Sequence, residues 1–275
     1  MTMPRRHLAL ALAALLATNG VIAGERENVR ANEAVRVVEQ IQAIPESAIP
    51  DRLLDEAKAI IVVPDTIKAG FMFGGRRGLG LMAVKTPQGT WSDPVFVKLA
   101  GASFGLQAGV QSADVVLVFR NDRSLESIVN GKFTLGADAG IAAGPVGRNA
   151  AAATDGQLKA EIWSWSRARG LFAGVALDGA VLSIDNGANR SAYGSSVTPR
   201  MVFEGRAPQA PSAAITGFRD ALEEATAAAG YARRGTTAPS QPRPAEPGAA
   251  EVQPLYNDNP ATTTPLDPQP AATNP

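Results

Sequence analysis

The stretch of chain after Lys58 constrains the fold most, because it holds many short strand-like segments and little that forms a helix. The run AIIVVP begins it with β-branched residues and ends in a proline, a pattern typical of a buried strand. Further apolar segments follow, separated by turn signals at residues 74–77, 86–89, 121–122 and 186–187. Strands this close together, without helices between most of them, predict an antiparallel sheet rather than a parallel one.

Helical patterns lie on both sides of this stretch. Residues 27–44 bring a set of small apolar side chains near one face, namely Val29, Ala31, Ala34, Val35, Val38 and Ile41. We expect further helices after Pro50, over 124–131 with Ser124 as N-cap, and over 212–230 between a Ser212 cap and a Gly230 stop. The predicted fold class is α+β, mainly an antiparallel β barrel or sandwich with N-terminal and C-terminal helices packed on it.

The two ends of the chain differ in composition from the region between them. Arg5 and Arg6 precede the apolar run LALALAALLA, which predicts a signal peptide over residues 1–23, with an uncleaved anchor as the alternative. Residues 231–275 are rich in Pro, Ala and Thr and predict a disordered tail. We therefore expect one folded domain over 25–230, exported to the periplasm or cell envelope and peripheral to the membrane.

Composition excludes several classes of chemistry. The chain has no cysteine, and its one histidine, His7, lies inside the predicted signal peptide. Disulfides, thiol nucleophiles, histidine bases and zinc sites built from Cys or His are therefore excluded for the mature domain, and we expect no cofactor or metal. Acidic and basic residues balance at 26 each. No overall positive charge attracts nucleic acid, so recognition of an anion has to be local.

The glycine-rich stretch KAGFMFGGRRGLGLMAVK, residues 68–85, resembles a phosphate-binding loop at first sight. Such a loop needs a helix after the glycines, or a Lys-Ser/Thr pair, and neither follows here. A β-hairpin with Gly74, Gly75 and Gly78 at positive φ explains the same residues, and leaves Arg76 and Arg77 exposed at its tip. The GASFG segment matches a nucleophile elbow, but the mature domain lacks the histidine of a serine triad, which disfavours a serine hydrolase and leaves a Ser–Lys dyad with Lys98 or Lys132 as the alternative.

The segment KAEIWSWSRARGLFAG, residues 159–174, is the most informative one for function. With a period of two, Trp163, Trp165, Arg167 and Arg169 share one strand face. Tryptophans beside cations suit the interface of a membrane with anionic headgroups. The alternative is that both indoles pack in the core beneath a terminal helix, with the arginines reaching outward.

Several stretches in the same order resemble the SYLF domain, also known as DUF500 or the yeast actin-binding-type domain. They are IPDRLLDEAKAIIVVPDTIKAGF, GRRGLGLMAVK, GTWSDPVFVKLAGASFGLQAGVQSADVVLVF, NGKFTLGADAGIAAGPVGRNA and LKAEIWSWSRARGLFAGVALDGAVL. The resemblance covers about residues 25–230 and implies a lipid-binding module. Eukaryotic members bind phosphoinositides and membranes, partly through an N-terminal helix, and some bind actin; bacterial members are typically exported.

We therefore predict non-enzymatic binding of anionic phospholipid at a membrane surface. The expected headgroup contacts are the cations Lys68, Arg76, Arg77, Arg148, Arg167 and Arg169, and the expected interfacial anchors are the aromatic residues Trp163, Trp165 and Phe172. The alternative is a protein-interaction or scaffold module of the envelope that uses the C-terminal tail or the glycine-rich sheet. An enzyme built on Asp114, Asp138 or Asp178 is a third hypothesis.

Overall fold

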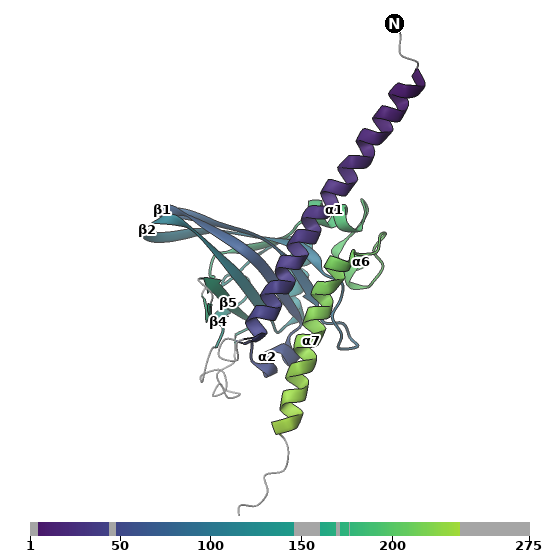
Figure 1. The fold of residues 1–275 in the computed structure, drawn as a ribbon. Coiled ribbons are helices and arrows are strands. Elements are labelled where there is room, and N and C mark those ends of the chain that lie inside the picture. Colours follow the sequence, from purple (N-terminus) through teal and green to yellow (C-terminus); the bar gives the residue numbers. More distant parts are fainter. Residues whose placement is uncertain (1–4, 44–47, 146–159, 169–170, 176, 237–275) are drawn as a thin grey trace, which may run out of the picture. The chain divides into compact units, whose positions relative to one another are not determined.

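The computed structural model describes residues 5–43, 48–145, 160–168, 171–175 and 177–236 (Figure 1). Its strands are β1 (Ala59–Val84), β2 (Val95–Phe119), β3 (Lys132–Thr134), β4 (Ile141–Ala143), β5 (Ile162–Ala168), β6 (Leu171–Gly174) and β7 (Val181–Ile184). Its helices are α1 (Arg5–Ala43), α2 (Asp51–Glu56), α3 (Asp122–Asn130), α5 (Asn186–Tyr193), α6 (Pro199–Phe203) and α7 (Ala213–Thr236). The predicted tail lies almost wholly outside the described residues.

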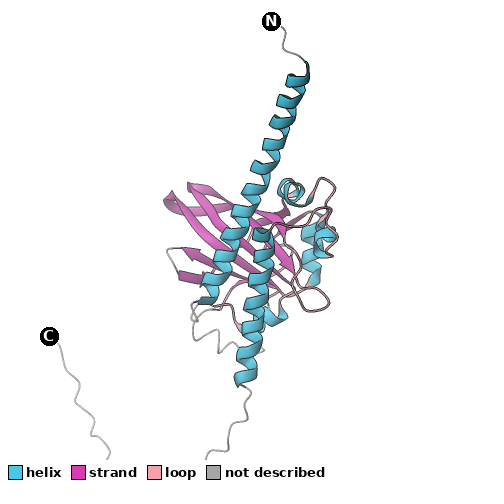
Figure 2. Ribbon diagram, turned by 45° about the vertical axis from the view of Figure 1, so that its right-hand side comes forward, coloured by secondary structure: helices cyan, strands magenta, loops and turns pink. Residues whose placement is uncertain are grey.

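The seven described strands form one sheet in the order β3-β7-β2-β5-β4, with β1 paired to β2 and β6 paired to β5. Every pair is antiparallel except β4 with β5. Helices α1 and α7 lie side by side across one face of the sheet, as two views of the molecule show (Figures 1 and 2). This arrangement confirms the predicted α+β class and the packing of both terminal helices on the sheet.

Strands β1 and β2 form one long two-stranded ribbon. Their connection at residues 86–89 is the predicted turn, in which Gly89 has a φ of 86° and donates its N–H to the Thr86 carbonyl. The hairpin predicted at residues 74–77 is wrong. Gly74 pairs with Ser103 and Gly78 with Leu99 inside the continuous ribbon, and neither has a positive φ. These glycines therefore serve another purpose than turning the chain.

That purpose is close packing of the two halves of β1. A Cβ atom added to Gly78 would collide with the side chains of Val63 and Thr66. One added to Gly80 would collide with the Val62 carbonyl oxygen and come within 2.9 Å of the Val63 Cα. The second half of β1 thus lies directly against the first half, at a separation that only glycine permits. The ribbon is folded back on itself.

Helix α1 runs without a break from the predicted signal peptide into the predicted amphipathic helix. From Ala31 onward its inward side chains are buried, whereas Val29 is 57% exposed, so the predicted apolar face is shorter than expected. Among the helices of the described residues, none is long and apolar enough to cross a membrane. Cleavage of residues 1–23 stays a prediction.

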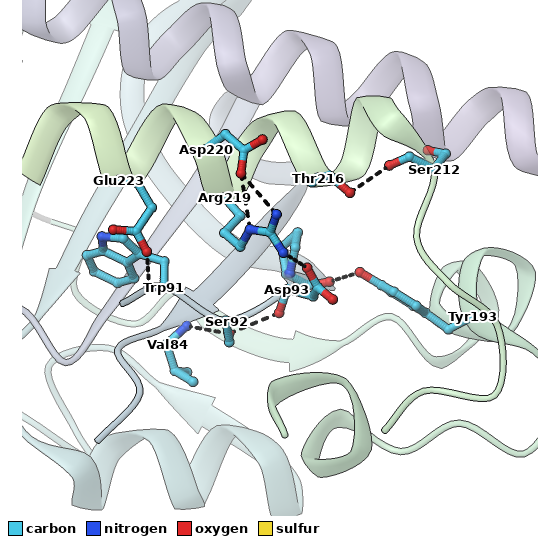
Figure 3. A network of polar contacts seen from close by, with 11 residues as sticks. Val84, Trp91, Ser92, Asp93, Tyr193, Ser212, Thr216, Arg219, Asp220 and Glu223 are labelled. Carbon is cyan, nitrogen blue, oxygen red and sulfur yellow. Dashed lines mark hydrogen bonds and ion pairs between the residues drawn. The ribbon is translucent and has the colours of Figure 1, made fainter. Parts of the chain in front are cut away.

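Helix α7 is fixed to the connection between β1 and β2 by a polar network (Figure 3). The backbone N–H of Trp91 donates to the Glu223 carboxylate at 2.5 Å, and Arg219 forms an ion pair with Asp93 at 2.8 Å. The predicted stripe of α7, including Phe218, is buried beneath these contacts. The C-terminal helix therefore closes the core at the turn end of the ribbon.

Two predicted helix boundaries and one predicted turn differ from the structure. Helix α3 begins earlier than expected, because Asn121 rather than Ser124 caps it and accepts the Ser124 N–H. Helix α7 continues past Gly230 to Thr236. Residues 186–187, expected to form a turn, begin helix α5, because the Asp185 side chain accepts the Ala188 N–H as an N-cap.

The close approach within β1 generates a stability prediction. Gly80→Ala should lower the free energy of unfolding by about 1–3 kcal/mol or more, since the added methyl meets backbone that cannot move aside. Thermal unfolding followed by circular dichroism should show a drop of about 2–4 °C per kcal/mol. Gly75→Ala is the matched control, because the nearest atom to its new Cβ is the Gly101 carbonyl oxygen at 3.9 Å. Equal midpoints for the two variants would contradict this packing.

Candidate functional site

A groove of about 1050 Å³ lies between helix α1 and the folded ribbon. We call it the α1–β1 groove. Its helical wall consists of Glu25, Arg26, Val29, Arg30 and Glu33. Its other wall comes from both halves of β1, namely Pro64, Asp65, Ile67 and Ala69 before the bend and Gly75, Arg76, Arg77, Gly78 and Leu79 after it. The fold-back of β1 therefore brings two distant segments of one strand to the same groove.

The groove has an exposed apolar surface. Val29 on the helix and Ile67 on the ribbon are 57% and 51% exposed. Val110 is 75% exposed and pairs with Ala69, so it extends the same ribbon face beyond the groove lining. These are the large apolar side chains that the described residues leave open to solvent. Their clustering marks a surface suited to an apolar ligand.

Three of the four guanidiniums in the groove lining lack an ion-pair partner among the described residues. Within the described part of the chain, Arg26, Arg76 and Arg77 form no ion pair. Arg76 is half-buried, and this burial lowers the pKa of its guanidinium. Because arginine stays charged at neutral pH, the groove holds a partly desolvated positive charge that forms no ion pair with any described carboxylate.

The remaining arginine of the groove, Arg30, is neutralised. It lies 3.3 Å from one oxygen of Asp185, while Lys98 lies 3.2 Å from the other, and the Arg30 guanidinium stacks over the Phe96 ring. Burial opposes the charge on Asp185, but the Ala188 N–H, Lys98 and Arg30 together hold the pKa of the Asp185 carboxyl below its ordinary value. This carboxylate fixes the groove end of α1 to β2 and α5.

A second shared carboxylate fixes α1 further along. Asp114 on β2 is buried, with Arg36 of α1 at 3.5 Å and Arg167 of β5 at 3.2 Å. The Asp65 backbone N–H donates to the same carboxylate at 3.1 Å. The helix, two strands and the edge of the groove are therefore joined at one buried charge. Asp114 has a structural environment, which gives the enzyme hypothesis no support.

The structure brings together two of the predicted headgroup contacts. Arg76 and Arg77 line the groove. Lys68 is exposed but pairs with Gln111, on the ribbon face opposite Ile67 and Ala69. Arg148 and Arg169 lie outside the described residues. Their contribution stays a prediction.

The predicted aromatic anchors are not at the surface, so this part of the prediction is wrong for the described conformation. Trp163, Trp165 and Phe172 are 7%, 0% and 5% exposed. The Trp165 ring packs where a Cβ on Gly144 would stand, and Arg167 covers the Phe172 ring at 5.4 Å. Ile162 and Ser164, which alternate with the two tryptophans along β5, are buried as well, so both faces of this part of the strand are covered. The alternative of core packing is therefore correct, although the contact of Trp165 is with Gly144.

Sequence reasoning missed most of the groove. The sequence pattern predicts Val29 on the apolar face of the N-terminal helix, and it assigns no role to Asp65 or Ile67. Ile67 and Ala69 alternate with Thr66 and Lys68, which is the pattern of a half-buried strand, so no signal in the sequence indicates that their face is open to solvent. The described residues contain no group of His, Cys, Asp or Glu that could hold a metal ion.

Comparison with known proteins places this site in context. Residues 100–225 match the family model described as Ysc84, Las17-binding protein actin regulator. An SH3 domain-containing protein of Schizosaccharomyces pombe is 38% identical over 177 residues, which are 63% of this chain and 41% of that protein. Protein YSC84 of Saccharomyces cerevisiae is 36% identical over 172 residues, 61% of this chain and 36% of the relative.

A human relative, SH3 domain-containing YSC84-like protein 1, is 30% identical over 185 residues, 65% of this chain and 54% of that protein. In Saccharomyces cerevisiae, LAS seventeen-binding protein 3 is 34% identical over 170 residues. The match thus spans between about a third and about half of the length of these relatives. The family-model match includes most of β2 and all of β5, whereas the walls of the groove, residues 25–33 and 64–79, precede it in the chain.

The depressed pKa of Asp185 generates a pH prediction. An ionised Asp185 favours the folded protein above the unfolded pKa, near 3.8, and this contribution is lost as the pH falls through the lower folded pKa. Asp185→Asn should cost about 1–3 kcal/mol at pH 7, because a charge-assisted contact is lost while the amide still caps α5. Urea unfolding at pH 7 and at pH 3 should show that the difference from wild type narrows in acid. A constant difference would contradict the assignment.

Proposed function

This chain belongs to the SYLF family, and we propose that it binds anionic phospholipid at a membrane surface in the cell envelope, through the α1–β1 groove. The proposed role is non-enzymatic binding. The groove would receive the phosphate of the lipid at Arg76 and Arg77 and part of the lipid's apolar body on Val29 and Ile67. The proposed binding site is therefore the groove and not the aromatic residues of β5, which are buried.

The observation that carries the proposal is the half-buried, unpaired guanidinium of Arg76 beside exposed apolar side chains. Removing a cation from water is costly unless an anion compensates it. No described carboxylate does so for Arg76. A phosphate would supply that charge, and arginine is well suited to hold it through paired N–H···O bonds. The site thus favours a ligand with a phosphate group.

The apolar part of the groove indicates that the phosphate belongs to an amphiphile. A small hydrophilic anion would leave Val29 and Ile67 exposed to water, whereas a lipid would bury them, at about 25 cal/mol for each Å² covered. The volume of about 1050 Å³ is at the upper end of ligand pockets, roughly 300–1,000 Å³. A ligand with both a phosphate and a large apolar body fits these properties better than a free anion.

The position of the groove relative to the predicted signal peptide supports a location in the envelope. The helical wall begins at Glu25, directly after the segment 1–23 that we expect to direct export. Processing there would leave the groove at the start of the mature chain. The groove would then face the envelope membranes as a peripheral site.

A protein-interaction module is the second candidate function. The matched family model is described as a Las17-binding protein actin regulator, and two yeast relatives are named LAS seventeen-binding protein 3. A protein partner for this chain, bound through the ribbon or through the C-terminal tail, would agree with those names. Partner capture that is independent of lipid, and unchanged by substitutions in the groove, would favour this function.

Vesicle binding tests the lipid proposal. Arg76→Gln/Arg77→Gln should reduce partitioning onto phosphatidylglycerol vesicles roughly thirtyfold, at about 1 kcal/mol for each basic residue near an anionic surface. Co-sedimentation at fixed ionic strength measures this, because salt screens the exposed charges. Arg123→Gln/Lys132→Gln is the matched control, since it removes the same charge from exposed positions on α3 and β3.

The control should bind nearly as well as wild type, with a loss of less than about threefold, because its residues are not part of the groove lining. Equal losses in both double variants would indicate binding by overall charge and would contradict a local site. Absence of wild-type binding to phosphatidylglycerol vesicles would contradict the function itself.

A further inference from the structure

Asp65 has an unusual backbone conformation at the edge of the α1–β1 groove. Its φ of 44° makes it the one non-glycine residue with a positive φ in the described part of the chain. It lies where the register of β1 against β2 shifts, between Val63 and Thr66. Aspartate tolerates this left-handed region better than most residues, but glycine adopts it at lower cost. The conformation alone therefore does not require a carboxylate here.

Hydrogen bonds hold Asp65 in this conformation. Its backbone N–H donates to Asp114, the buried carboxylate shared by Arg36 and Arg167. One of its side-chain oxygens accepts the Ser112 hydroxyl at 3.1 Å. The buried network thus over-determines the backbone of Asp65, and the exposed side chain is positioned at the groove wall. Local strain of this kind tends to occur where a side chain is placed for function.

The charges of the groove are kept apart. The lining contains three guanidiniums without a partner among the described residues, yet the Asp65 carboxylate forms an ion pair with none of them. Its second oxygen makes no hydrogen bond to another described residue. The groove therefore presents separate cationic and acidic positions. A ligand that satisfies both needs an anionic group and, beside it, a hydrogen-bond donor.

We infer that Asp65 selects phospholipids whose headgroup carries a hydrogen-bond donor, a hydroxyl or an ammonium group, next to the phosphate diester. This inference rests on the proposed lipid-binding function and names the headgroup class. The phosphate binds at Arg76 and Arg77, and the donor binds at the free oxygen of Asp65. A phosphodiester without such a donor leaves the carboxylate facing a phosphate of the same sign, which weakens its binding.

Two lipids of equal charge test this selectivity. Phosphatidylglycerol has hydroxyl groups beyond its phosphate, whereas phosphatidylmethanol has the same diester charge and no donor. Wild-type protein should bind vesicles of the first about three- to tenfold more tightly than vesicles of the second, as expected for one exposed charge-assisted hydrogen bond. Co-sedimentation with vesicles of matched size and acyl composition measures the ratio of the affinity for phosphatidylglycerol vesicles to the affinity for phosphatidylmethanol vesicles.

Asp65→Asn is the variant of choice, because asparagine tolerates the same φ and its side-chain oxygen can still accept the Ser112 hydroxyl. It should bring the ratio to about one, mainly by improved binding of phosphatidylmethanol. Asp65→Gly also fits the backbone and removes the side chain. It should bring the ratio to about one as well, and it replaces the asparagine variant if that protein does not fold.

The outcomes separate the inference from the function on which it rests. If both Asp65 variants bind both lipids more tightly by the same factor, the carboxylate acts only through its charge and the inference is overturned. A wild-type ratio of about one, with the Arg76→Gln/Arg77→Gln loss intact, also overturns it while the groove function stands. Failure of wild-type protein to bind either vesicle overturns the lipid-binding function instead.

Discussion

The contact between the two halves of β1 is the constraint on which the rest of the structure depends. Gly78 and Gly80 let one half of the strand lie against Val62, Val63 and Thr66 of the other half. Without this approach the long β1–β2 ribbon would extend as a two-stranded hairpin, which is at best marginally stable by itself. Folded back, it brings residues 64–69 and 75–79 to one groove beneath α1. The same glycines therefore determine both the core and the site.

Helix α1 is attached to the folded ribbon by two carboxylates, and each is shared by two cations. Asp185 holds Arg30 and Lys98, and Asp114 holds Arg36 and Arg167. Such pairs specify geometry more than they add stability, because desolvation offsets much of their attraction. Their second consequence is electrostatic. These two buried acids already have cationic partners, among them Arg30 of the groove, so Arg26, Arg76 and Arg77 form no ion pair with a described residue.

Local patterns in the sequence predicted the elements whose structure depends on near neighbours. The stripe of α7, the turn at residues 86–89 and the buried run after Lys58 follow from periodicity and turn chemistry, and all three are confirmed. The fold-back of β1 could not be predicted in this way. It brings together residues that are distant in the sequence of one continuous strand, such as Val63 and Gly78. Burial of Trp163 and Trp165 depends on what packs over the faces of β5 in the tertiary structure, such as Gly144 against Trp165. The positive φ of Asp65 depends on the register shift between β1 and β2. The two arginines of the site, Arg76 and Arg77, could be predicted from the local sequence. Its apolar wall could be identified only in the tertiary structure.

The account places the lipid in the α1–β1 groove, and photo-crosslinking tests that placement most directly. Full-length protein would be illuminated on vesicles containing phosphatidylglycerol with a photoreactive group in the acyl chain, and the modified peptides mapped by mass spectrometry. We predict adducts on α1 within residues 25–33 and on β1 within residues 64–79, the two walls of the groove. Adducts concentrated elsewhere, such as on residues 160–175 around the β5 aromatics, with none on the groove walls, would contradict the central claim.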